Sequence, residues 1–241
     1  MCIIPGTLFS VSRYTGQKKT IVLKPDNFIA ADHPSYVKPD VVLPKWDKNL
    51  NIPNWFYLGL ADYYGYGWFR YKIFINDTTK AYSLYAPFAY GNCYIYFNEV
   101  LIFQTASDEQ TAQKGDSILT APSLISIDPK IVQKGVNYIS VRTKGLDGMG
   151  GHRYPLNFGL TDSIESIFVF QTLKASSYFS ILIFLSIFFG LYYFTQKQDY
   201  YLHFAGASFS LALWHSVDEG LIQHFFSLNT PISLIGYTGA L

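Results

Sequence analysis

The sequence predicts a mainly β chain in which an antiparallel sandwich is followed by transmembrane α-helices. Short segments with alternating apolar and polar residues recur between residues 68 and 160. No helix long enough for a βαβ crossover separates them, which favours an antiparallel sandwich. Behind them lies a run of 21 residues, 175–195, that contains no charge and is almost entirely apolar.

This apolar run is long enough to cross a bilayer. At a rise of about 1.5 Å per residue, a helix over 175–195 spans a hydrocarbon core of ~30 Å. The alternative is a buried helix of a soluble protein, which needs a protein shell around all its faces. The remaining chain is too short to build one, and it consists of an uncharged run at 200–217 and a mostly apolar stretch at 221–241. We therefore expect transmembrane helices at about 175–195 and 200–217 and the start of a third.

The composition argues against nucleic acid as a partner and shows a high share of aromatic residues. The net charge of +1 gives no electrostatic reason to expect nucleic-acid binding. Tyr and Phe, 20 of each, raise the aromatic share to 18%, which suits both strands and membrane interfaces.

Cys2 and Cys93 have no partner at metal-ligand spacing, and Cys93 falls within a predicted strand. We expect Cys93 to be a small buried side chain rather than half of a disulfide, and we expect no metal and no cofactor.

The predicted strands follow one another at short intervals. The first 50 residues are punctuated by Pro and Lys and contain one clear strand candidate, 20–24, so they read as an arm or an edge rather than a core. Residues 129–135 read as a turn with a single helical twist that is closed by Gly135. Further strands are expected at 68–75, 81–86, 93–97, 100–103, 123–128, 137–144, 155–160 and 166–172.

Motifs in these strands resemble those of a known family. Residues 67–72 read GWFRYK, residues 94–99 read YIYFNE, and residues 134–142 read KGVNYISVR. Together they resemble the galactose-binding-like jelly roll that serves as the sugar-binding domain of family 2 glycoside hydrolases, over residues 55–160. The chain departs from that pattern at Glu99, where the family usually has glycine. The resemblance implies a jelly roll and points to a carbohydrate as a possible ligand class, although several motif residues have folding duties that say nothing about a sugar.

The membrane part carries a second resemblance. The segments GLYYF at 190–194, QKQD at 196–199 and YYLHF at 200–204 resemble the start of the membrane region of bacterial seven-transmembrane receptors with diverse intracellular signalling modules. In that family an extracytoplasmic β-sandwich precedes seven helices, and an enzymatic signalling module follows. The resemblance implies a multi-pass sensor of the cell inner membrane whose output part is missing from this chain. It also allows a homodimer formed through that missing part.

Candidate binding residues come from a strand and a loop. The loop 145–153 contains four glycines, so its backbone can approach a ligand closely. The alternative is a flexible connection between two strands. Aromatic residues such as Trp68 can stack on a sugar ring, but packing against the arm is an equally good reading. The candidate ligand-binding residues are Trp68, Arg70, Asp147, His152 and Arg153.

No catalytic residue is expected. Glycoside hydrolysis needs two carboxyl groups that flank a cleft, whereas the acids of the sandwich fall mostly in predicted turns, where they are solvated or cap backbone groups. We expect a division into an N-terminal arm (1–49), an extracytoplasmic β-sandwich (50–172) and a transmembrane region (173–241) of a truncated chain.

The expected function is that of the sensory, ligand-binding part of a membrane-bound receptor, with the lipid bilayer and a small molecule as partners. The joint at 170–174 is too short to flex freely, so a ligand in the sandwich would act directly on the tops of the helices. One alternative is the non-catalytic, sugar-binding-like part of a membrane-anchored glycoside hydrolase. The other is a structural module that docks a partner protein.

Overall fold

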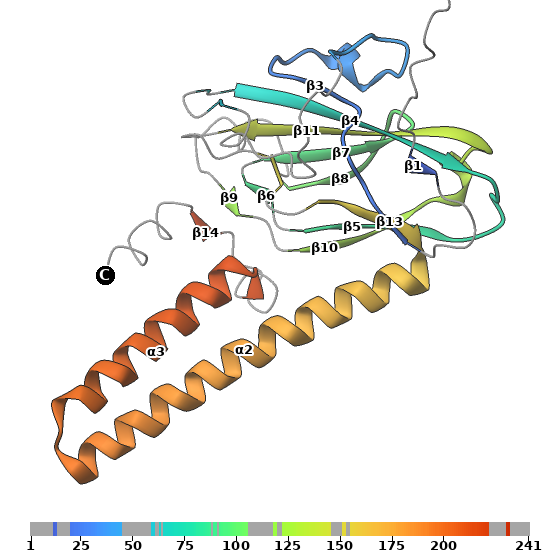
Figure 1. Cartoon of the computed structure of the whole chain (residues 1–241). Helices are drawn as coiled ribbons and strands as arrows, with labels where there is room; N and C mark the ends of the chain where they lie inside the picture. The colour runs from blue at the N-terminus through green and yellow to red at the C-terminus, as the bar shows by residue number, and fades with distance from the viewer. Residues whose placement is uncertain are drawn as a thin grey trace, which may run out of the picture.

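A β-sandwich followed by a helical hairpin makes up the described part of the chain (Figure 1). The computed structural model describes residues 12–13, 20–44, 59–60, 63, 65–87, 89–90, 92–105, 118–119, 122–145, 151–152, 155–221 and 230–231. The mainly β fold with helices behind it is confirmed. The jelly-roll topology and the membrane location of the helices stay predictions.

The first sheet is built around the long pair formed by β4 and β11. Its strands are β1 (Ser12–Arg13), β3 (Asn27–Ile29), β4 (Gly65–Ile75), β7 (Cys93–Phe97), β8 (Val100–Gln104) and β11 (Gly135–Gly145). Their order is β1-β4-β11-β7-β8, with β3 also paired to β4. β1 runs parallel to β4, and the other neighbours are antiparallel.

The second sheet faces the first on one side and the helices on the other. It contains β2 (Thr20–Val22), β5 (Tyr82–Ala86), β10 (Ser123–Ile127) and β13 (Asn157–Leu160), in the order β10-β5-β13-β2. A smaller sheet joins β12 (Gly151–His152), β6 (Ala89–Tyr90), β9 (Ile118–Leu119) and β14 (Thr230–Pro231) in that order. Short 3-10 turns, η1 (Pro34–Val37) and η3 (Pro129–Ile131), complete the sandwich.

The core lies between the first two sheets. Alternate residues of β4 point into it, namely Phe69, Tyr71, Ile73 and Ile75, as the sequence alternation predicts. Phe158 of the second sheet stacks on Tyr82 of the same sheet at 5.4 Å between ring centroids, and it reaches Phe97 of the first sheet at 6.5 Å. Cys93 is buried and free, as expected, and burial raises the pKa of its thiol. Hydrophobic burial of these side chains is the main stabilising contribution.

A buried amide network shapes the turn that precedes β11. Asn98 Nδ2 donates to Asn137 Oδ1 at 2.7 Å, and Asn137 Nδ2 donates to the carbonyl of Gln133 at 2.7 Å. Gly135 adopts a φ of 106°, and η3 supplies the predicted helical twist before it. Glu99 has a φ of 72°, a conformation that glycine adopts most easily. The positive φ explains why glycine suits position 99. The motif residues Asn98, Gly135 and Asn137 likewise serve the fold.

The N-terminal arm supplies edge strands to both sheets. β2 pairs with β13 at the edge of the second sheet, and β3 pairs with β4 in the first. The edge role and the strand predicted at 20–24 are confirmed. The prediction that the arm contributes nothing to the core is wrong, because Leu23 is only 1% exposed and belongs to the core cluster.

One arm residue makes the stability of the sandwich depend on pH. The carboxylate of Asp26 accepts a hydrogen bond from the backbone N–H of Lys72 at 2.6 Å, yet burial raises the pKa of Asp26 to about 6. The folded state therefore binds its proton more tightly than the unfolded state does. The resulting stability is full below the unfolded pKa of 3.8 and is lost as pH rises through about 6.

We expect wild-type stability, measured relative to Asp26→Asn, to fall between pH 4 and 7. The expected loss is about 1–2 kcal/mol, reduced from the full linkage value because the carboxyl is partly exposed to solvent. Denaturant unfolding of the full chain in detergent, followed by near-ultraviolet circular dichroism, measures the difference at each pH. A difference that rises with pH, or that stays flat, would contradict the assignment.

The helices begin earlier than predicted. α2 (Thr161–Gln196) starts directly after β13, and α3 (Asp199–Asp218) returns antiparallel to it (Figure 1). The strand predicted at 166–172 is therefore wrong. Ile164, Phe168 and Ala175 recur at helical spacing, and the apparent alternation between them is coincidental. The prediction of a third helix near residue 221 falls largely outside the described residues, and Thr230–Pro231 form β14.

Candidate functional site

Arg70, predicted as a ligand-binding residue, holds the arm onto the outer face of the first sheet. It is 4% exposed, and its guanidinium donates to three backbone carbonyls of the arm. The acceptors are Val41 at 2.7 Å from Nη1, and Tyr36 at 2.8 Å and Lys38 at 2.6 Å from Nη2. Three of its hydrogen bonds thus serve the fold.

Trp68 lies beside Arg70 under the same segment. Its ring stacks on Tyr96 at 5.7 Å between centroids, and its indole N–H donates to Asp32 at 3.2 Å. Arg142 donates two hydrogen bonds to the same carboxylate, from Nε to Oδ1 at 2.8 Å and from Nη2 to Oδ2 at 2.6 Å. Its guanidinium carbon also lies 3.8 Å from the centroid of the Tyr66 ring. Burial raises the pKa of Asp32, but the hydrogen bonds and charge of Arg142 outweigh it, so the pKa is lowered. A ligand role for Trp68 and Arg70 stays a prediction; the structure shows them covered by the arm.

The glycine-rich loop is largely outside the described residues. Asp147 and Arg153 lie outside them, and of His152 only the backbone is described, paired with Ala89 between β12 and β6. Their role stays a prediction. Among the described residues, no group of three or more His, Cys, Asp or Glu side chains could hold a metal ion.

A different site forms where the sandwich meets the helices. The first turns of α2 pack on the outer face of β5, where the Tyr85 and Phe168 rings meet edge to face at 6.1 Å. The Ser83 and Thr161 hydroxyls lie 2.9 Å apart, and the Thr161 N–H donates to the Ala81 carbonyl at 3.1 Å. α2 is thereby fixed to the second sheet from its first residue.

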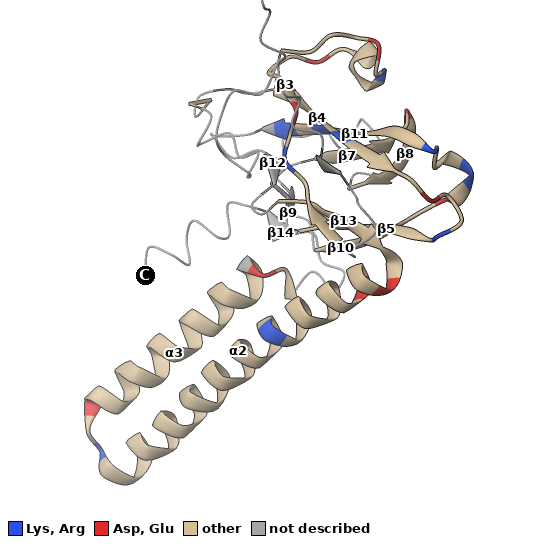
Figure 2. Cartoon of the chain, turned by 45° about the vertical axis from the view of Figure 1, so that its right-hand side comes forward, with Lys and Arg blue, Asp and Glu red and all other residues tan. Residues whose placement is uncertain are grey.

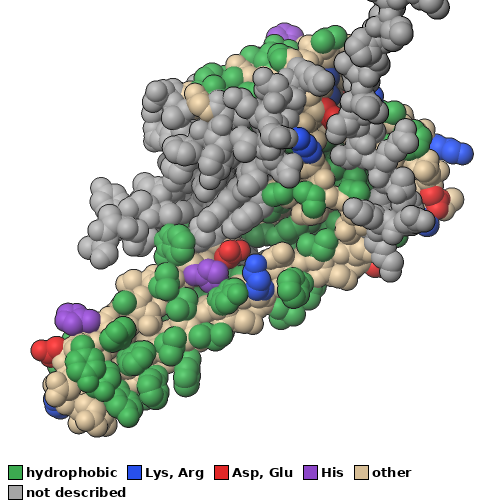
Figure 3. All heavy atoms as spheres, in the orientation of Figure 1, with side chains coloured by type: hydrophobic (Ala, Val, Ile, Leu, Met, Phe, Trp, Pro, Cys, Tyr) green, Lys and Arg blue, Asp and Glu red, His purple; other side chains and the backbone are tan. Residues whose placement is uncertain are grey.

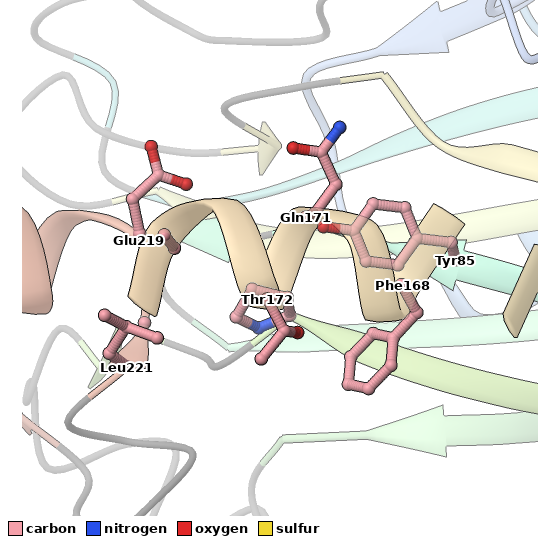
Figure 4. A pocket seen from close by; sticks show the side chains of 9 residues that line it. Tyr85, Phe168, Gln171, Thr172, Glu219 and Leu221 are labelled. Atoms are coloured by element: carbon pink, nitrogen blue, oxygen red, sulfur yellow. The ribbon is translucent and has the colours of Figure 1, made fainter. Parts of the chain in front are cut away.

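A cavity of about 420 Å³ opens beside this contact. Its lining comes from β5, β13, α2, the prolines near the strand ends and the residue after α3: Tyr85, Pro87, Pro122, Pro155, Asn157, Ile167, Gln171, Lys174 and Glu219. A smaller adjoining space of about 20 Å³ shares some of these residues and adds Phe168, Thr172 and Leu221 (Figure 4). In Figure 4 the Glu219 carboxylate and the Gln171 amide point the same way.

The charged groups of this site come from α2 and from the residue that follows α3. Lys174 is exposed on α2, and Glu219 is half-buried just beyond α3. Among the described residues no ion pair joins them, because the ion pairs found there are Lys80–Asp77 and Arg142–Asp32. The described lining of the cavity therefore includes one positive and one negative side chain that do not form an ion pair with each other, together with two side-chain amides and apolar residues.

Sequence reasoning missed this cavity, although one signal pointed to it. Lys174 directly precedes the first uncharged run, and Asp218 and Glu219 directly follow the second, on the other side of the polar joint at 196–199. Folding the chain into a hairpin at that joint brings Lys174 and Glu219 to the same level. The proline lining and the contribution of β5 carry no such sequence signal.

Comparisons with known proteins give similar structures but no family. No protein-family model matches the chain, and no curated protein matches it. A β-glucuronidase from Bacteroides uniformis is 14% identical with a TM-score of 0.44, covering 58% of this chain and 17% of that one. A glycosyl hydrolase family 2 member from Bacteroides cellulosilyticus is 15% identical with a TM-score of 0.42, covering 59% of this chain and 21% of that one.

A family 2 β-galacturonidase from Eisenbergiella tayi is 7% identical with a TM-score of 0.41, covering 59% of this chain and 25% of that one. The chain thus spans a quarter or less of each of these three structures. All three are glycoside hydrolases, and none of the three is a seven-transmembrane receptor. TM-scores below 0.5 do not establish a shared fold.

Proposed function

We propose that this chain is the extracytoplasmic, ligand-sensing part of a membrane-bound receptor, together with the first helices of its membrane region. The observation that carries the proposal is the continuity of α2. This 36-residue helix begins on the outer face of the sandwich and continues, without a break, into the uncharged segment. The role is binding and signalling rather than catalysis.

The character of α2 supports a location in the membrane. Of the described helices, only α2 has the length and hydropathy of a membrane span, a test that core helices of soluble proteins also pass. A core helix is mostly buried, whereas the most apolar 18-residue window of α2 has no buried residue. Its large apolar side chains are open to the surroundings, with Phe184 at 65% and Leu191 at 62% exposed. Water is a poor environment for such a surface, and lipid is a good one.

The charge distribution of the helical hairpin also supports a location in the membrane. Figure 2 shows its charged residues at the end next to the sandwich and at the turn, and Figure 3 shows apolar side chains along its length. No charged residue lies within 175–196 of α2 or 200–217 of α3. At about 1.5 Å per residue, these stretches are ~27–33 Å long, close to the hydrocarbon thickness.

Rigid attachment is what signal transfer requires. The first residue of α2 is hydrogen-bonded to β5, and α2 lines the cavity from Ile167 to Lys174, so a ligand in the cavity would contact the sandwich, α2 and the residue that follows α3. A ligand that binds one arrangement of these elements better than another would shift the helices' equilibrium.

Cysteine accessibility tests the orientation. In a Cys2→Ser background, Lys80→Cys lies in an exposed turn of the sandwich and Lys197→Cys lies at the turn of the hairpin. Cys93 is fully buried, so it serves as an unreactive internal control. We expect a membrane-impermeant maleimide to label Lys80→Cys in intact spheroplasts and to label Lys197→Cys only after lysis. The reverse pattern would overturn the orientation, and recovery of the chain in the soluble fraction would overturn the membrane location.

A further inference from the structure

We propose that the junction cavity binds a small zwitterion: a molecule that carries a primary ammonium at one end and a phosphate or carboxylate at the other. The inference deepens the proposed function, on which it rests, by naming the chemical class that the cavity recognises. Lys174 would pair with the anionic group and Glu219 with the ammonium. The neutral groups of the cavity would bind the atoms between them.

The separated charges are the first argument. Lys174 and Glu219 both line the cavity, and no ion pair joins them within the described part of the chain. The described lining carries one charge of each sign, so it repels neither end of a zwitterion. A purely cationic or purely anionic molecule, in contrast, satisfies one residue and leaves the other without a counter-charge.

The size and the neutral lining are the second argument. At about 420 Å³ the cavity falls at the lower end of the range for small-molecule sites, which is too small for a folded partner. The Gln171 side chain makes no hydrogen bond within the described part of the chain, so its amide can donate and accept. The Nδ2 of Asn157 donates to the Pro155 carbonyl at 3.2 Å, which leaves its Oδ1 as an acceptor. The proline rings add apolar contact and no backbone N–H donor.

The level of the cavity along the hairpin is the third argument. Lys174 directly precedes the uncharged stretch of α2. Asp218 directly follows the uncharged stretch of α3, and Glu219 is the next residue. If the uncharged stretches occupy the hydrocarbon, both residues lie at the depth of lipid headgroups. The same chemistry can therefore arrive from two sources, as a phosphoethanolamine headgroup of the outer leaflet or as a dissolved molecule.

The first arm of the test uses dissolved phosphoethanolamine and the full chain in nanodiscs of phosphatidylglycerol, a lipid without an ammonium. Calorimetry should show saturable binding that weakens at least tenfold in Lys174→Gln and in Glu219→Gln. Lys197→Gln and Glu165→Gln are matched controls, because they remove the same charges outside the cavity, and should bind as the wild type does. Ethanolamine alone and inorganic phosphate alone should bind at least tenfold more weakly than the zwitterion.

The second arm replaces part of the phosphatidylglycerol with phosphatidylethanolamine. The headgroup is the source if two results are found together. The lipid competes with dissolved phosphoethanolamine for binding, and native mass spectrometry shows that the wild type retains the lipid whereas Glu219→Gln does not. Absence of competition with binding intact would identify a dissolved ligand.

The proposal is overturned if neither arm shows binding, if the control variants lose binding as much as the cavity variants do, or if phosphate or ethanolamine alone binds equally well. Correct membrane orientation without zwitterion binding would remove this inference and leave the proposed function. Zwitterion binding by a chain with the reverse orientation would remove the proposed function instead.

Discussion

Replacing Arg70 with methionine should detach the arm from the first sheet and destabilise the sandwich by about 3–5 kcal/mol. The guanidinium is 4% exposed and donates to the carbonyls of Tyr36, Lys38 and Val41. Hydrogen bonds from a charged donor contribute about 1.5–3 kcal/mol each, and part of that is regained when freed carbonyls meet water. Methionine keeps the apolar stem of the side chain, so the loss reports the hydrogen bonds rather than a cavity.

Trypsin provides a direct readout of the arm, because Lys38 lies in the segment that Arg70 holds. Cleavage after Lys38 should accelerate strongly in Arg70→Met, and denaturant unfolding should shift to a lower midpoint. The control is Lys80→Met, which removes an exposed ion pair of 3.6 Å to Asp77 and should leave the unfolding midpoint and the rate of cleavage after Lys38 unchanged. If Arg70→Met resists trypsin as the wild type does, the arm is held by other contacts.

The strands could be predicted because their signal is local. Alternation of apolar and polar residues placed the core face of β4 correctly, and the turn before β11 followed from its Pro, Gly and Asn residues. The role of Arg70 could not be predicted in the same way. Its three acceptors lie 29 to 34 residues earlier in the chain, and no periodic pattern links them. An alternating strand shows which residues share a face, but not what covers that face.

The misreading of residues 166–172 had a larger consequence than its length suggests. Treated as a strand, the segment ended the sandwich and left a short joint before the helix. As part of α2, it forms the contact of Phe168 with Tyr85 and one wall of the cavity. The candidate site at the junction was therefore hidden by one error of periodicity. The turn of the hairpin and the end of α3 were placed nearly correctly because charge and the polar joint mark them, whereas α2 begins 14 residues earlier than predicted.

The connection between core and helix leads to the other large expected effect, that of Phe158→Ala. Phe158 is fully buried, stacks on Tyr82 and Phe97, and stands three residues before the start of α2. Truncating a buried Phe to Ala removes apolar contact and leaves a cavity, which costs about 3–5 kcal/mol. Phe158→Leu keeps most of the volume and should cost about 1–1.5 kcal/mol.

The same substitution tests whether the sandwich positions the helix. β13 is central in its sheet, between β5 and β2, and it leads directly into α2, so a weakened core beneath it should loosen the first turns of the helix. Hydrogen exchange of amides at 165–172 in detergent should accelerate in Phe158→Ala, while exchange near the hairpin turn stays unchanged. Val22→Ala is the control, because Val22 is 56% exposed on the neighbouring edge strand β2. Equal hydrogen-exchange protection of 165–172 in Phe158→Ala, Phe158→Leu and Val22→Ala would mean that contacts within the hairpin hold α2 in place. A change in the sandwich would then not be transmitted to the helices.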